Sequence, residues 1–181
     1  MEKYLTVAFL GAGAAAFAIL TCFLWRCNAE RLTRSENLLR NRFLGAVLGA
    51  LALAWCVPQI QAVAWHSLAA LAWPLAAGAL VLCVLYLDNL VARALAGLLI
   101  MGAYSFLDMS FDNHLASGWS SALIPWVWGA VGIAIAARPC YLRDYLRLGA
   151  KAAPWRFMAS ALTLISALFL LASVLFFLIR G

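Results

Sequence analysis

Long apolar stretches separated by short polar ones dominate the pattern along this chain. A helix needs about 20 mostly apolar residues to cross the ~30 Å hydrocarbon layer of a bilayer. Stretches of this kind lie at residues 4–25, 43–63, 67–87, 90–107, 119–137 and 157–179. The pattern predicts an all-α, polytopic integral membrane protein, a bundle of about six transmembrane helices that forms one domain over residues 1–181.

Two polar interruptions bear on where these helices end. In the second stretch Pro58, followed by Gln59 and Gln61, predicts that the helix either stops there or continues with a kink, because proline lacks a backbone donor. Asp88 and Asn89 predict a tight turn between the third and fourth stretches. The acidic segment 108–118, which follows the fourth stretch, is predicted to be a loop.

Charge then sets an orientation. Only 11% of the residues are charged, against about 25% in ordinary soluble domains. If the six helices alternate in direction, eleven of the thirteen Lys and Arg residues fall on one side, and Lys3 and Arg180 on the other. Cytoplasmic loops carry the Lys and Arg excess. We therefore expect a multi-pass protein of the cytoplasmic (inner) membrane of a bacterium, with its Arg-rich loops in the cytoplasm and both termini outside, or periplasmic. Topology explains the net charge of +6 without a nucleic-acid partner.

The first stretch is also compatible with a signal peptide, because small residues gather at Ala14 to Ala18. Its apolar pattern continues to Trp25, however, which is longer than the usual signal core. An uncleaved first helix is the favoured interpretation.

Two basic stretches, 26–42 and 138–156, contain apolar residues at helical spacing. Each is compatible with a helical extension or with a short helix lying on anionic lipid. The simpler interpretation, which we favour, is that both serve only as positive-inside anchors.

Small residues recur within the apolar stretches. Gly45 and Gly49 form a GxxxG pattern, which allows two helix backbones to approach closely. Other small residues in spans predict the same role: Gly129, Gly132, Ala159, Thr163, Ser166 and Ser173. The segment Gly11 to Ala16 imitates a dinucleotide-binding fingerprint, but the strand and helix context that this motif requires is absent. Such faces predict tight packing, with a homo-oligomer or a larger membrane complex as possible partners beside the lipid bilayer.

A candidate binding site lies on the predicted outer side. Trp126 and Trp128 stand roughly 10–14 Å into the fifth stretch at helical rise, deeper than an interfacial aromatic belt. Since they are two positions apart, they point to different faces, so at least one should meet protein or a cavity. Polar residues on the same side complete the candidate ligand-binding set: His66, Asp108, Asp112 and His114. The spacing of Asp108 and Asp112 would let the two carboxylates share one helical face, with His114 nearby. Carboxylates and imidazoles favour a cation, with a metal ion left open. A solvated polar loop is the simpler interpretation of these residues.

Catalytic signatures and cofactor motifs are absent from the sequence. The five cysteines show no CxxC or Cys-His spacing, and the arrangements typical of hydrolases and metalloproteases do not occur. The sequence therefore supports, in this order, a transport-related protein with an outward-facing polar and aromatic site, an accessory or assembly subunit of a larger membrane complex, and a membrane-embedded enzyme acting at the outer surface.

Overall fold

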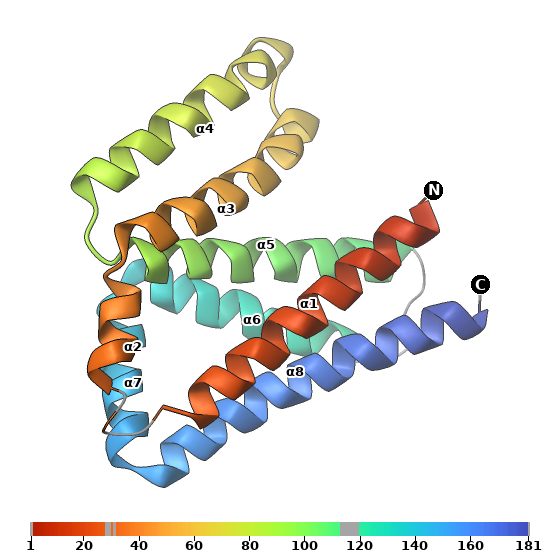
Figure 1. Ribbon diagram of the computed structural model, residues 1–181. Coiled ribbons are helices and arrows are strands. Elements are labelled where there is room, and N and C mark those ends of the chain that lie inside the picture. Colours follow the sequence, from red (N-terminus) through yellow and green to blue (C-terminus); the bar gives the residue numbers. More distant parts are fainter. Residues whose placement is uncertain (1, 28–29, 31, 113–119, 181) are drawn as a thin grey trace. The chain divides into compact units, whose positions relative to one another are not determined.

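The structure is a computed structural model that describes residues 2–27, 30, 32–112 and 120–180. Helices account for nearly all of these residues, and this part of the chain contains no strand. The helices are α1 (Glu2–Trp25), α2 (Leu32–Leu39), α3 (Arg42–Val63), α4 (His66–Tyr86), α5 (Leu90–Asp112), α6 (Ser120–Ala137), α7 (Cys140–Lys151) and α8 (Ala153–Arg180) (Figure 1). The predicted all-α class is confirmed.

Five of the described helices are long and apolar enough to cross a membrane: α1, α3, α4, α5 and α8. A sixth span is present if α6 and α7 are counted together, although the chain bends by 107° between them. Pro139 lies at this bend, where it disfavours a helical conformation for Arg138. The structure thus agrees with a membrane protein of about six transmembrane helices.

The chain forms two compact units. Unit 1 comprises Met1–Thr33, Tyr104–Trp126 and Asp144–Gly181, and unit 2 comprises Arg34–Ala103 and Val127–Arg143. Helices α2, α5, α6 and α7 each contribute one part to each unit. Whether the whole chain behaves as a single domain stays a prediction.

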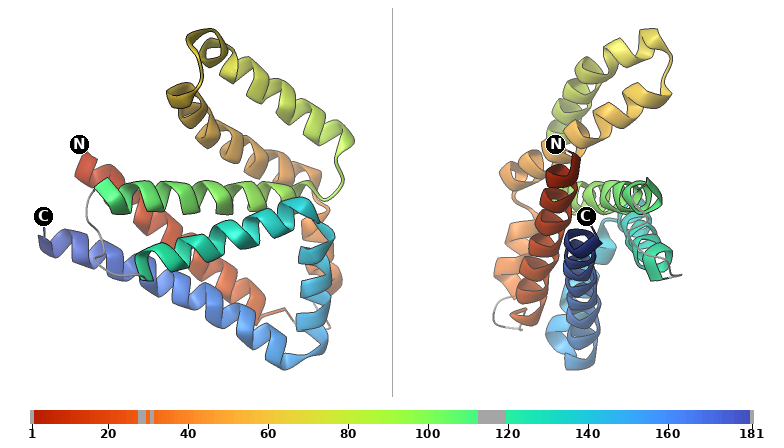
Figure 2. Two further views of the ribbon diagram at one scale, coloured as in Figure 1. Left: turned by 180° about the vertical axis from the view of Figure 1, so that it is seen from behind. Right: turned by 90° about the vertical axis from the view of Figure 1, so that its right-hand side faces the viewer.

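Unit 1 is built on the long contact between α1 and α8, which lie side by side in both Figure 1 and Figure 2. Leu10 and Ala14, four residues apart on α1, are buried, as is Leu170 on α8. Gly13 leaves room for this leucine, since a Cβ atom there would lie 3.1 Å from Leu170 Cδ1. Phe106 of α5 is fully buried, and its ring packs 5.3 Å from that of Phe169, measured between centroids.

Hydroxyl side chains line the same face of α8. Ser166 and Ser173 are buried and donate to carbonyl oxygens of their own helix, those of Leu162 and Phe169. Thr163 Oγ1 lies 2.8 Å from Thr21 Oγ1 of α1, which gives the two helices a direct polar contact. Satisfied hydroxyls can be buried at small cost, and their small volume lets helices approach. The small-residue stripe on the last span is therefore a packing face against α1.

In unit 2, α3 and α4 form an antiparallel hairpin (Figure 1). Asn41 caps α3, because its Oδ1 accepts hydrogen bonds from the backbone N–H groups of Phe43 and Leu44. Helix α3 continues through Pro58 to Val63. Of the two alternatives drawn from the sequence, an end at the proline is wrong. Proline is tolerated inside apolar helices because neighbouring groups can satisfy the backbone carbonyl that loses its donor.

The start of α5 packs tightly against α3 and α6 in unit 2. Ala92 and Ala96 of α5 form a buried cluster with Ile135 of α6. Asn89 begins this region with a positive φ of 56°, a left-handed conformation that asparagine tolerates in turns. The predicted turn between the third and fourth spans is confirmed, since α4 ends at Tyr86 and α5 begins at Leu90.

Both basic stretches contain a short helix, α2 and α7. At 1.5 Å per residue, the 12 residues of α7 span about 18 Å, too short to cross a bilayer alone. Each helix is amphipathic: Leu39 of α2 and Leu146 of α7 are buried, while Arg34 and Lys151 are exposed. Both basic stretches thus contain a helix, and their role as positive-inside anchors stays a prediction.

Candidate functional site

The predicted carboxylates lie on a helix and not in a loop. Helix α5 runs to Asp112, five residues past the predicted end at residue 107. The correction has a simple cause: between Leu107 and Asp112 the sequence contains neither Gly nor Pro, so the helix can extend beyond its apolar part. Asp108 and Asp112 are therefore one turn apart on one face of α5, with Tyr104 a further turn back.

This position is electrostatically unusual. Asp108 and Asp112 occupy the last turns of α5, where the helix dipole is negative and carboxylates are disfavoured. Asp108 also falls inside the apolar span Leu90–Phe111. Its side chain is exposed, and no Lys or Arg occurs between residues 94 and 137. The end of α5 thus concentrates negative potential, which attracts cations.

The two tryptophans of α6 point to different environments. Trp128 is 6% exposed, whereas Trp126 is 70% exposed. Trp126 lies one residue after Pro125, which is fully buried. The burial of Trp128 is in line with the expectation that at least one of these indoles meets protein.

The six predicted ligand-binding residues are divided between the units. Asp108, Asp112 and Trp126 belong to unit 1, while His66 and Trp128 belong to unit 2. His66 is the first residue of α4, and His114 lies outside the described residues. Within the part of the chain that the structure describes, no three His, Cys, Asp or Glu side chains gather as a metal site would require. Of the five predicted residues that the structure describes, unit 1 therefore holds three: Asp108 and Asp112 of α5, and Trp126 of α6.

Gly45 and Gly49, the predicted helix-packing pair, are both buried on α3. They face different neighbours. A Cβ atom on Gly45 would lie 2.8 Å from Leu90 Cβ of α5, and one on Gly49 would lie 3.3 Å from Leu80 Cδ1 of α4. One glycine pair therefore brings two different helices close to α3.

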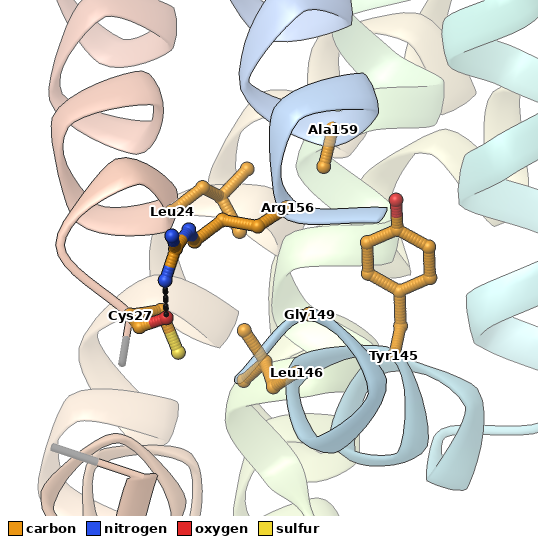
Figure 3. A pocket seen from close by; sticks show the side chains of 7 residues that line it. All are labelled: Leu24, Cys27, Tyr145, Leu146, Gly149, Arg156 and Ala159. Carbon is orange, nitrogen blue, oxygen red and sulfur yellow. Dashed lines mark hydrogen bonds between the residues drawn. The ribbon is translucent and has the colours of Figure 1, made fainter. Parts of the chain in front are cut away.

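A polar corner between α1, α7 and α8 was not predicted (Figure 3). Arg156 Nη1 donates to the backbone oxygen of Cys27, just beyond the end of α1, over 3.4 Å. A cation is favourable at a helix C-terminus, where backbone carbonyls lack partners. In the sequence this arginine is one of many in a basic stretch. Membrane topology alone was enough to explain its charge, and nothing in the sequence indicated its hydrogen bond to Cys27.

Tyr145 holds the other side of this corner. Its hydroxyl donates to the backbone oxygen of Trp155 over 2.9 Å, and the two rings meet edge to face at 6.4 Å. Burial raises the pKa of the Tyr145 phenol above its ordinary value. The hollow between these residues has a volume of about 10 Å³, which is near the space of a single water molecule. We therefore interpret the corner as a structural joint.

No protein family, curated protein or solved structure matches the chain. The fold itself defines a class: a small, helical, multi-pass membrane protein.

Proposed function

We propose that this protein is transport-related and takes a cation from the outer side of the cytoplasmic membrane at the end of α5. One observation carries the proposal: an apolar span ends with Asp108 and Asp112 on one face, at the negative end of the helix dipole. Ionisable groups in membrane spans are costly and usually serve a function. Neither acid has a compensating Lys or Arg nearby in sequence.

Aromatic residues support a cationic ligand. Tyr104 shares the face of Asp108, and both side chains are exposed. Trp126 of the same unit is also exposed. Aromatic faces attract cations through their quadrupole, and the attraction grows where water is excluded. These residues therefore favour an organic cation or a metal ion over an anion.

The proposed orientation rests on charge. Each helix in the basic stretches, α2 and α7, carries exposed basic side chains. Because cytoplasmic loops carry the Lys and Arg excess, we place this end in the cytoplasm. The end of α5 then faces outward.

The test is cation binding by the full chain in lipid nanodiscs, with tetraphenylphosphonium and Mn²⁺ as the two probes. Asp108→Asn should weaken binding of the probe that the protein takes by about tenfold or more. This equals roughly 1.4 kcal/mol, well within the value of a close ion pair near a protein surface. Asp88→Asn is the matched control, because it removes one carboxylate from the turn between α4 and α5 and should leave binding unchanged.

Equal binding by Asp108→Asn and the unaltered protein would contradict the proposal. So would the absence of binding of both probes. Such a result would favour the second candidate, an accessory or assembly subunit of a larger membrane complex. Helix α4 favours that candidate: only 6% of its span is buried, and Gly78 has no atom of another residue near the place of a Cβ.

A further inference from the structure

Three helix ends meet at one end of unit 2. A Cβ atom on Gly45, in the first turn of α3, would lie 3.0 Å from the backbone nitrogen of Val91, at the start of α5. On the other side, Ala92 clusters with Ile135, near the end of α6. The starts of α3 and α5 and the end of α6 therefore share one level of the unit.

Each of these helix ends carries an arginine with an exposed side chain. Arg42 is the first residue of α3, Arg93 lies in the first turn of α5, and Arg138 directly follows α6. The guanidinium of Arg138 lies 5.7 Å from the centre of the Tyr141 ring, a cation–π contact that restricts its position. Within the described residues, none of the three forms an ion pair. Asp88, in the turn before α5, offsets one of the three charges at most.

The depth of these arginines in the bilayer can be inferred from the helices that carry them. Arg42–Val63 and Leu90–Phe111 are spans apolar enough to cross the hydrocarbon layer. A residue in the first turn of such a span lies where the chain leaves hydrocarbon, which is the depth of the lipid phosphates. Arginine offers a planar fork of donors that matches a phosphate group.

We propose that this end of unit 2, with Arg42, Arg93 and Arg138, binds the phosphate headgroups of anionic phospholipids. The surface combines positive charge, the donor geometry of guanidinium and placement at headgroup depth. Lipid binding at this surface does not depend on which way the protein is oriented in the membrane. The proposal is therefore independent of the proposed cation site.

The test is a lipid titration of the detergent-solubilised full chain, followed by native mass spectrometry, with phosphatidylglycerol and phosphatidylcholine compared. The unaltered protein should retain phosphatidylglycerol in preference. A basic residue near an anionic surface changes binding by roughly fivefold. The variant Arg93→Gln/Arg138→Gln should therefore weaken phosphatidylglycerol binding by about 30-fold.

The variant Lys3→Gln/Arg180→Gln is the matched control, because it removes two positive charges from the other side of the predicted topology. It should retain phosphatidylglycerol like the unaltered protein. Equal loss in the two variants would show a response to net charge alone and overturn the proposal. Competition by millimolar inorganic phosphate as effective as that by the lipid would also overturn it, since the ligand would then be a free anion. If the double variant does not purify, Arg138→Gln and Arg180→Gln replace the pair, with a loss confined to Arg138→Gln as the supporting result.

Discussion

Gly45 and Gly132 lie where helices touch, and their missing side chains make these contacts possible. A Cβ atom on Gly132 would lie 2.8 Å from Ile100 Cγ1 and 3.0 Å from the backbone oxygen of Ala96. The contacts at Gly45 are as short and also include a backbone atom. Because backbone atoms cannot turn aside as a flexible side chain does, even a methyl group forces the helices apart.

Replacing Gly45 with alanine should lower the stability of the protein by about 1–3 kcal/mol, the usual cost of overpacking. Gly78→Ala is the matched control on α4, since nothing lies within 4 Å of its Cβ position. There alanine should be neutral or stabilise the helix by up to about 1 kcal/mol. Thermal unfolding in detergent measures both variants, and an equal effect of the two would contradict the packing described for Gly45.

The residues that the sequence could identify are those whose role follows from spacing alone. The GxxxG pattern identified Gly45 and Gly49, but it could not say that one faces α5 and the other α4. In the same way, the spacing of Trp126 and Trp128 separates their faces without saying which indole is buried. Arg156 escaped notice because its partner is the backbone oxygen of Cys27, and backbone partners leave no sequence signature.

At the scale of elements, α1 and α8 are joined by side chains that are both small and polar. Thr21 Oγ1 lies 2.8 Å from both Thr163 Oγ1 and the backbone oxygen of Phe17. Thr163 Oγ1 in turn approaches the backbone oxygens of Ala159 and Ser160. The two hydroxyl protons can therefore serve one contact within a helix and one across the pair. Such interhelical hydrogen bonds are modest in membranes.

A double-mutant cycle of Thr21→Val and Thr163→Val should give a coupling energy of about 0.6 kcal/mol, the average for membrane helices. Valine keeps the shape of threonine, so the cycle removes the hydrogen bond with little change in packing. The control cycle pairs Thr21→Val with Ser173→Ala, whose hydroxyl bonds within α8, and should give a coupling near zero. Equal coupling in the two cycles would show that no specific bond joins Thr21 and Thr163.

The sequence predicted the helices well and their ends less well. Apolar length places the six stretches, because the bilayer fixes how much apolar chain a span requires. It does not fix where a helix stops once it leaves hydrocarbon. For that reason α5 continues through Asp108 to Asp112, and α8 begins at Ala153, before the predicted residue 157. At Pro58 the sequence left two outcomes open, and α3 continues past the proline to Val63, where the second apolar stretch ends.

At the scale of the whole molecule, the central claim is a multi-pass protein with its basic end in the cytoplasm. If the spans alternate in direction, eleven Lys and Arg residues fall on one side, and Lys3 and Arg180 on the other. The structure contains helices long and apolar enough for such spans. The proposed cation site depends on this orientation, because it places the end of α5 outside. The candidate site could be predicted only in part. Its residue types follow from the sequence, and so does the spacing that lets Asp108 and Asp112 share one helical face. That both belong to α5 itself, and not to the loop expected after residue 107, appears only in the structure.

Cysteine accessibility tests this claim most directly. In a chain whose five native cysteines are replaced, single cysteines are introduced at Phe111, near the end of α5, and at Asn37 of α2, both of which have exposed side chains. A membrane-impermeant maleimide applied to intact bacterial cells should label Phe111→Cys. It should label Asn37→Cys only after the membrane is permeabilised. Labelling of Asn37→Cys in intact cells, with Phe111→Cys protected until permeabilisation, would contradict the orientation and the outward-facing cation site with it.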